Sequence, residues 1–252
     1  GADHTIRGAG QLLINIGGMT NDGTILAEGN YPLIINPGTP GFTNQGTLRA
    51  VGPGGLTLRN GAFLNMGATI EVADGSVLDL DDAGLVGGHL AATGAGTGQI
   101  LAGNMTSLHE VTVDAGTTVD QANGDIVDIF GGLTNDGTWN INSIGGSTAN
   151  TYLRFQGSQT LGGSGEVVLS DDPNNVVRVS ADTEILAHAA DHTIRGAGNL
   201  LQNVGGMVNH GTIIADGSYA LTVNPGSGGF TSDGLIEVLA GSTLTSPFGD
   251  TL

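Results

Sequence analysis

The sequence predicts an all-β protein, a parallel β-helix (β-solenoid) of about eleven coils of roughly 19–28 residues each. The first reason is a long repeat: the stretch from Ala2 to Met19 returns from Ala190 to Met207 with fifteen of eighteen positions identical, after a shift of 188 residues. The second is a shorter period of apolar residues inside that repeat. The third is the composition, since 46 glycines and 4% aromatic residues stand beside 38% hydrophobic residues. Self-similarity of this kind is typical of a repeat array rather than of a compact enzyme.

Each expected coil opens with an apolar residue that begins an alternating strand. A mixed residue follows it, as at Arg7, Glu71 and Asn140, and a small or apolar residue comes next. This alternation is typical of a half-buried strand, in which successive side chains point to opposite faces. The expected strand starts are Ile6, Ile25, Leu48, Ile70, Leu90, Val111, Trp139, Val167, Ile194, Ile213 and Ile236.

Two further apolar columns follow in most coils, which predicts three short strands around one core. The second column contains Leu33 and Ile35, Leu56 and Leu58, Leu78 and Leu80, Leu153 and Phe155, Val177 and Val179, and Leu221 and Val223. The third contains Met19, Phe42, Phe63, Leu133, Met207 and Phe230. Stacked coils rise about 4.8 Å each, so the predicted rod is on the order of 50 Å long. Stacked antiparallel hairpins are the weaker alternative, because two-residue hairpin turns do not recur between adjacent strands.

A turn motif, Asn-X-Gly-Thr, ends many of these coils. We expect its asparagines to meet at a single corner of the stack, where their amides pair from coil to coil and tolerate a left-handed backbone. The threonines are expected to open the next strand, where β-branching is favourable. The asparagines are Asn21, Asn44, Asn65, Asn135 and Asn209, and the threonines are Thr24, Thr47, Thr138 and Thr212. A ligand role for this motif is the less favoured interpretation.

The charge balance, the lack of cysteine and the lack of long apolar runs each argue against particular kinds of function or site. The chain has 24 acidic residues and six basic ones, all arginine, for a formal net charge of −18. Nucleic acid is therefore not an expected partner, since phosphate binding needs clustered cations. The absence of cysteine excludes disulfides and thiolate metal sites. No apolar run approaches the length that spans a membrane, and no signal peptide opens the chain.

The glycine-rich segment from Gly8 to Gly29, GAGQLLINIGGMTNDGTILAEG, and its second copy from Gly196 to Gly217 resemble the repeats of large bacterial secreted and surface proteins. The similarity is to the passenger regions of autotransporters and to filamentous-haemagglutinin-like proteins. It implies a right-handed β-helical fibre, stalk or adhesin outside the cell or on the bacterial surface. Other copies of the chain and cell-surface or matrix glycans are the partners it suggests.

A carbohydrate-active enzyme is the alternative, because polysaccharide lyases and hydrolases also use this scaffold. Such sites need paired carboxylates, or calcium held by acidic oxygens beside a basic residue. The candidate groups are Asp79, Asp81 and Asp82, and Asp171 and Asp172 near Arg178. Neither group is accompanied by the Asn-Thr-Asp, Gly-His-Gly and Arg-Ile-Lys segments typical of polygalacturonases. An ice-binding array is disfavoured, since the outward column mixes Arg, Glu, Leu, Thr and Asn.

The coils that begin at Val111, Trp139 and Val167 are longer than their neighbours, and loops on a rigid scaffold often carry function. Their extra polar residues are Asp120, Asp125 and Asp128, residues 145–150, and residues 171–175. If these loops leave from one corner, they form a patch that contacts a partner or loosely holds calcium. The candidate calcium ligands are Asp120, Asp125, Asp171 and Asp172. The simpler interpretation is that these loops are solvated turns that bind neither a partner nor calcium.

No resident cofactor or catalytic group is expected. His4 and His192 occupy the same position in the two copies and cannot share one metal ion, and the other histidines are expected at separate corners.

We expect residues 1–252 to form one continuous segment, with a long repeat over 2–189 and a partial second copy over 190–252. Its expected role is a rigid rod that spaces or adheres. Exposed coil edges would join further repeats or other copies end to end into filaments.

Overall fold

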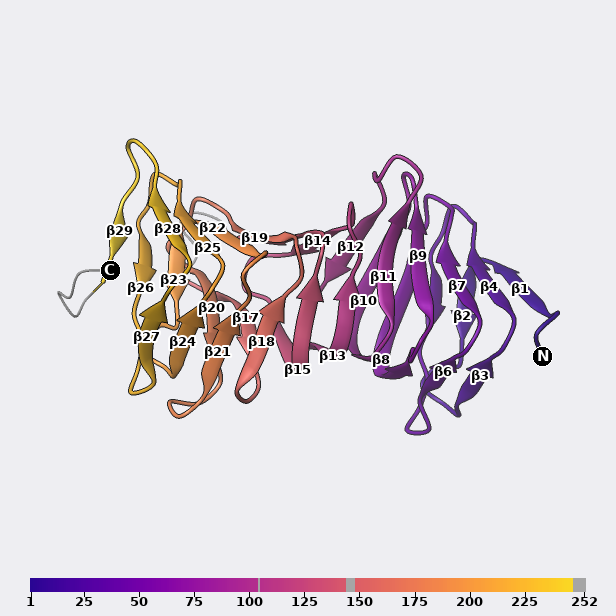
Figure 1. Cartoon of the computed structure of the whole chain (residues 1–252). Coiled ribbons are helices and arrows are strands. Elements are labelled where there is room, and N and C mark those ends of the chain that lie inside the picture. Colours follow the sequence, from indigo (N-terminus) through magenta and orange to yellow (C-terminus); the bar gives the residue numbers. More distant parts are fainter. Residues whose placement is uncertain (104, 144–147, 247–252) are drawn as a thin grey trace.

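The structure of the chain, a computed structural model, describes residues 1–103, 105–143 and 148–246. Within these ranges the chain forms 29 strands and no helix. The strands pair in parallel with strands of the neighbouring turns, so that the chain winds as one continuous solenoid (Figure 1). This confirms the predicted parallel β-solenoid.

Three rows of stacked strands form the walls of the solenoid. Row 1 contains β1 (Thr5–Gly8), β4 (Thr24–Ala27), β7 (Thr47–Ala50), β9 (Thr69–Ala73), β11 (His89–Thr93), the second parts of β13 (Thr106–Val113) and β15 (Ile126–Asn135), β18 (Gln159–Gly162), β21 (Ile185–His188), β24 (Gly206–Asn209) and β27 (Gly229–Ser232). Row 2 contains β2 (Gly10–Leu12), β5 (Leu33–Ile35), the first parts of β8 (Leu56–Leu64) and β10 (Val77–Val86), β12 (Gln99–Ala102), β14 (Thr118–Gln121), β16 (Thr138–Ile141), β19 (Glu166–Leu169), β22 (Thr193–Gly196), β25 (Thr212–Ala215) and β28 (Leu235–Val238). Row 3 contains β3 (Met19–Asn21), β6 (Phe42–Asn44), the second parts of β8 and β10, the first parts of β13 and β15, β17 (Thr151–Phe155), β20 (Asn175–Val179), β23 (Gly198–Leu200), β26 (Leu221–Val223) and β29 (Leu244–Thr245).

The stack has eleven levels, each with one strand position in every row. Level 1 consists of β1, β2 and β3, and level 11 of β27, β28 and β29. Four long strands, β8, β10, β13 and β15, turn a corner and so contribute to two rows each. From level 1 to level 11 the described chain therefore climbs ten turns.

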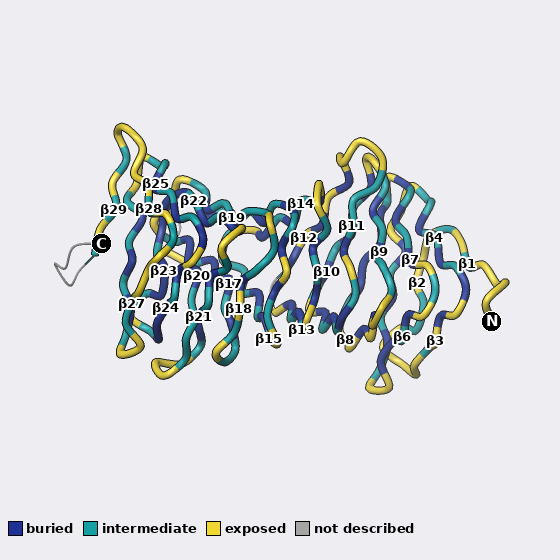
Figure 2. The backbone as a smooth tube through the Cα atoms, viewed as in Figure 1, coloured by how far each residue is buried: buried dark blue, intermediate teal, exposed yellow. Residues whose placement is uncertain are grey.

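The core is a continuous apolar column along the axis. Burial alternates along the strands, as in β4 and β16, where the second and fourth residues are buried. Trp139 is among the largest fully buried side chains, and the rings of Phe42 and Phe63 pack against each other in row 3, tilted by 47° with centroids 5.9 Å apart. Figure 2 shows buried positions recurring along each coil while turns at the corners are exposed. Each fully buried side chain of this size contributes about 1.5–3 kcal/mol, so stacking is the main source of stability.

The predicted strand starts do not form a single column, which corrects the sequence interpretation. Ile25, Leu48 and Ile70 do stack in row 1, and Leu90 continues that row by pairing with Val113. Trp139, however, lies in row 2, paired with Val119. The interval from Val111 to Trp139 is thus one and a third turns rather than one long coil. The error has a physical reason: every wall needs the same inward apolar alternation, so the pattern does not say which wall a strand joins.

The two copies of the long repeat lie in different rows, because each of the three walls accepts the same inward apolar alternation. Strands β22, β23 and β24 are the equivalents of β1, β2 and β3, 188 residues on. In the first copy these strands lie in rows 1, 2 and 3, and in the second they lie in rows 2, 3 and 1 at levels 9 and 10. A 188-residue repeat therefore makes eight and a third turns. Equivalent surfaces of the two copies face different sides of the rod.

Candidate functional site

The outward face of row 2 carries an acidic groove at the middle of the rod. Asp79 of β10, Leu101 of β12 and Asp120 of β14 are partners on consecutive levels, and they point outward because their strand neighbours are buried. Asp125, in the turn after β14, and Asn142, after β16, complete the wall of a groove of about 450 Å³. Leu101 is 38% exposed between the two aspartates. The groove thus combines carboxylates and an amide with an aliphatic floor.

Two of these carboxyl groups hold a proton more readily than an ordinary aspartate. Burial raises the pKa of Asp79, the charge of Asp81 raises it further, and Arg59 opposes the rise. Burial also raises the pKa of Asp125, against a hydrogen bond from the backbone of Ala122. A raised pKa is typical of carboxyl groups that act as acids, although buried structural carboxyls share it.

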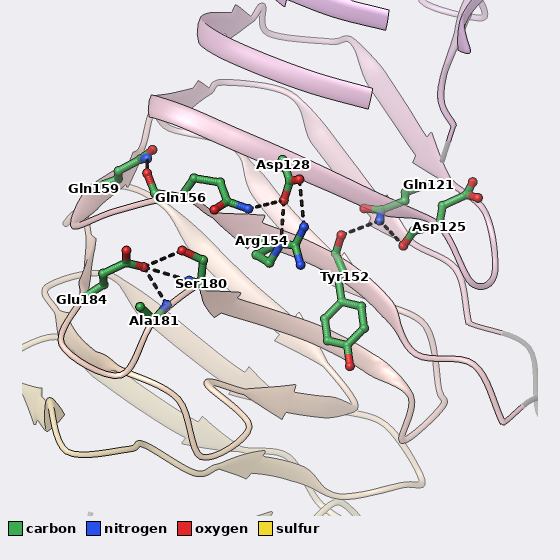
Figure 3. A network of polar contacts seen from close by, with 10 residues as sticks. All are labelled: Gln121, Asp125, Asp128, Tyr152, Arg154, Gln156, Gln159, Ser180, Ala181 and Glu184. Atoms are coloured by element: carbon green, nitrogen blue, oxygen red, sulfur yellow. Dashed lines mark hydrogen bonds and ion pairs between the residues drawn. The ribbon is translucent and has the colours of Figure 1, made fainter. Parts of the chain in front are cut away.

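Polar contacts of Gln121 hold the turn that carries Asp125, one of the residues that line the groove (Figure 3). The fully buried amide of Gln121 donates from Nε2 to the carbonyl oxygens of Asp125, at 2.9 Å, and Tyr152, at 2.8 Å. Its Oε1 accepts from Nε1 of Trp139 at 3.3 Å. Gln121 therefore ties the turn that carries Asp125 to the next level and to the core.

Ion pairs between neighbouring levels cover the outer walls. Arg154 binds Asp128 through two contacts, Nε to Oδ1 at 2.6 Å and Nη2 to Oδ2 at 2.9 Å. The other arginine pairs are Arg7 with Glu28, Arg49 with Glu71, Arg59 with Asp81, and Arg195 with both Glu166 and Asp216. The sixth arginine, Arg178, lies over the ring of Tyr152, 4.7 Å from its centroid. These cations thus act between coils and do not cluster at one place.

The predicted calcium ligands lie in two separate settings. Asp120 and Asp125 line the groove, and Asp120 accepts from Nδ2 of Asn140 at 2.8 Å. Asp171 accepts from the Ser218 hydroxyl and from the backbone N–H of Tyr219, two turns further along, and these bonds lower its pKa. Asp172 is buried and accepts from the N–H of Asn174 at 2.9 Å. Among the described residues no group of three His, Cys, Asp or Glu side chains is arranged to hold a metal ion.

The expected patch of three long loops is altered by the fold. Asp120 and Asp128 lie within β14 and β15, because the first of the three coils is not an insertion. Of the second predicted loop, residues 145–147 lie outside the described residues. The enzyme candidates are also dispersed: Asp81 binds Arg59, Asp171 ties a loop, and Arg178 stacks on Tyr152.

The asparagines of the turn motif line two corners rather than the single corner expected. At the corner between rows 3 and 1, Asn21 donates from Nδ2 to Oδ1 of Asn44 at 2.8 Å, and Asn44 donates likewise to Asn65 at 2.8 Å. We call these three residues the amide ladder. Asn135 and Asn209 end β15 and β24 in row 1 and so lie at the corner between rows 1 and 2. Asn135 belongs to the first copy of the repeat, so the change of corner already occurs within that copy. Thr24, Thr47, Thr138 and Thr212 are the first residues of β4, β7, β16 and β25.

Sequence reasoning missed one group, a pair of buried histidines at the second corner. His188 and His192 contact each other, with 3.0 Å between Nε2 of the former and Nδ1 of the latter. The sequence interpretation treated these histidines as separate. The signal that could have revealed this pair, the four-residue spacing in His-Ala-Ala-Asp-His, was not used in the sequence interpretation.

Comparisons with known proteins add no family. No protein-family model, no curated protein and no solved structure matches the chain. In the part of the chain that the structure describes, no helix is long and apolar enough to cross a membrane.

Proposed function

We propose that this solenoid is a structural and adhesive rod segment that works outside the cell or on a bacterial surface. The observation that supports the proposal is the ion pairing between neighbouring levels: five of the six arginines bind carboxylates of an adjacent level. Such pairs contribute little singly, but together with the amide ladder and the continuous core they tie each coil to the next. Bending the rod then requires many contacts to break together.

End-to-end association with neighbouring repeats or other copies is part of this proposal. Strands β1 to β3 and β27 to β29 each pair on one side only among the described residues, and an open strand edge offers unpaired backbone groups to another strand. Sedimentation at rising concentration tests this step. Growing rods of constant width are expected, and a monomer at all concentrations would contradict self-association.

Adhesion is tested with the chain immobilised on sensor surfaces and exposed to glycans and matrix proteins. Binding without release of shorter sugar products is the expected result for an adhesive rod. Loss of binding on removing outward side chains, with the fold retained, would locate the contact surface. The absence of binding to every glycan and matrix surface would leave a spacer role and contradict adhesion.

A carbohydrate-active site in the acidic groove is the second candidate, because Asp79 and Asp125 share that groove and both have raised pKa values. Glycoside hydrolysis uses two carboxyl groups, one of them protonated. Release of reducing ends from polysaccharides, abolished in both Asp79→Asn and Asp125→Asn, would support it. Asp171→Asn, whose carboxyl lies outside the groove, is the matched control.

A further inference from the structure

The two buried histidines lie between Asn135 and Asn209 at the corner between rows 1 and 2. His188 is the last residue of β21 at level 9, and His192 lies in the turn just before β22. Both side chains are fully buried, and their rings meet edge to face, with centroids 5.2 Å apart and planes at 82°. The imidazoles therefore contact each other directly within the wall of the rod.

The pair connects to an asparagine on each side. Nε2 of His192 lies 3.2 Å from Nδ2 of Asn135 on level 7, and Nδ1 of His188 lies 2.6 Å from Oδ1 of Asn209 on level 10. On level 8, between these residues, β18 ends at Gly162, and a Cβ atom at Gly163 would collide with the carbonyl oxygen of Asn135. We call Asn135, His192, His188 and Asn209 the histidine relay.

The hydrogen-bonding contacts of the two terminal asparagines determine which nitrogen of each histidine in the relay carries a proton. Nδ2 of Asn135 also donates to the carbonyl of Glu166 at 2.9 Å, so the amide nitrogen must face His192 and the Nε2 of His192 must accept. A neutral His192 then carries its proton on Nδ1 and donates to Nε2 of His188. His188 in turn donates from Nδ1 to Asn209. Every contact holds one proton, and both rings are neutral.

We propose that the histidine relay is an acid-sensitive latch, which holds the corner between rows 1 and 2 closed while both rings are neutral and opens it when either ring is protonated. A proton added to Nε2 of His188 would face the N–H of His192. One added to Nε2 of His192 would face the amide of Asn135. Each added proton replaces a hydrogen bond with a contact between two donors that is buried away from water. The positive charge can then be hydrated only if the corner opens.

The charged groups around the relay do not neutralise such a proton. Burial, together with the charge of His188, lowers the pKa of His192 to about 3, and Asp136 on level 7 opposes this shift. Burial lowers the pKa of His188, the hydrogen bond that His188 donates to Asn209 opposes this shift, and the charge of His210 lowers the pKa too. His210 itself binds Asp233, with 2.5 Å between Nδ1 and Oδ1, and Asp191 lies in the same turn as His192.

The direction of the pH dependence follows from these shifts. The folded values lie below the unfolded value of about 6.5, so the open corner binds more protons than the closed one between these values. The stability that the relay contributes is complete above about pH 6.5 and is lost as the pH falls toward about 3. The amide ladder, Asn21, Asn44 and Asn65, contains no titratable group and is a matched internal control.

Hydrogen exchange at pH 7.5 and pH 5.0, corrected for intrinsic rates, tests the latch. The reporters are the N–H of His210, which donates to the carbonyl of His188 at 2.9 Å, and the N–H of Thr212, which donates to that of His192 at 3.0 Å. Their protection should fall about 30-fold if opening exposes one ring and about 1,000-fold if it exposes both. The N–H groups of Gln45 and Thr47, beside the amide ladder, should keep their protection. Equal changes at the two corners, or none at either, would overturn the proposal.

A variant and a second measurement complete the test. His192→Gln keeps one titratable ring, so the fall in protection at Thr212 should shrink to about 30-fold or less. If that variant does not fold, nitrogen NMR of the unmodified chain decides. Both rings are expected to carry their single proton on Nδ1 at pH 5.0 in the closed state. A ring that carries protons on both nitrogens at pH 5.0, while the N–H groups of His210 and Thr212 stay protected from exchange, would refute the latch.

Discussion

The coil of β1 to β3 and the coil of β22 to β24 share nearly the same sequence, yet only the second is covered on both sides. Ile194 is fully buried beneath β19, whereas its equivalent Ile6 is only partly buried. His192 is fully buried, whereas His4 is exposed. Burial in this fold is therefore set by the neighbouring coil as much as by the residue itself, as expected where each repeat contacts only its neighbours.

The two copies also differ in direction. Because a repeat makes eight and a third turns, Arg195 lies on row 2 while its equivalent Arg7 lies on row 1. A surface feature encoded in each repeat is thus presented on successive faces of the rod. Identical residues in covered and uncovered settings provide matched pairs for measurement.

The largest expected difference comes from the inward isoleucines. Ile194→Ala should lose about 2–5 kcal/mol of unfolding free energy, since it leaves a cavity between levels 8 and 10. Ile6→Ala should lose roughly 1 kcal/mol, because Ile6 buries less surface. Urea denaturation of both variants measures the difference. Equal losses would mean that β19 does not cover β22.

The next difference concerns two glycines of identical conformation. Gly8 and Gly196 have φ angles of 121° and 118°, so a side chain meets the same backbone strain at both. At Gly196 a methyl group would collide with the carbonyl oxygen of Leu169, whereas at Gly8 it meets nothing within 4 Å. Gly196→Ala should therefore be about 1–3 kcal/mol more destabilising than Gly8→Ala. The same denaturation experiment checks this, and a smaller loss at Gly196 would contradict the close approach of level 8.

A smaller difference is expected for the outer ion pairs. Arg195 binds Asp216 as Arg7 binds the equivalent Glu28, but Arg195 also binds Glu166 of level 8. Arg195→Gln should cost about 0.5 kcal/mol, since these side chains are partly exposed. Arg7→Gln should cause no measurable change. Repeating the measurement in 1 M salt should reduce the cost at Arg195, and an unchanged cost would indicate lost packing instead.

The smallest effect is local and concerns two equivalent loops with Tyr31 and Tyr219. Asp171 accepts from the N–H of Tyr219 at 2.9 Å, and no carboxylate does so for Tyr31 within the described residues. Asp171→Asn should lower the exchange protection at Tyr219 and leave Tyr31 unchanged. Since these bonds lower the pKa of Asp171, the tie holds at neutral pH and weakens as the pH falls below about 3.9. Retained protection of Tyr219 in the variant would assign the order of this loop to its backbone.

The candidate sites were only partly predictable. The spacing of Asn21, Asn44 and Asn65 predicted a ladder because each ends a coil of similar length. Asp79, Asp120 and Asp125 meet in one groove only through the pairing of β10, β12 and β14, which no local pattern specifies. The contact of His192 with Asn135 joins residues 57 positions apart across level 8 and was equally hidden.

By itself the sequence determined that the chain winds in parallel coils, because apolar alternation and turn residues are local properties repeated at each coil. Which wall each strand joins was decided only by the tertiary structure. Trp139 and Leu48 have the same pattern, yet they lie in rows 2 and 1. The reason is that three walls around one core accept the same inward side chains, so only the summed lengths of the preceding coils fix the row, and with it every neighbour that a residue meets.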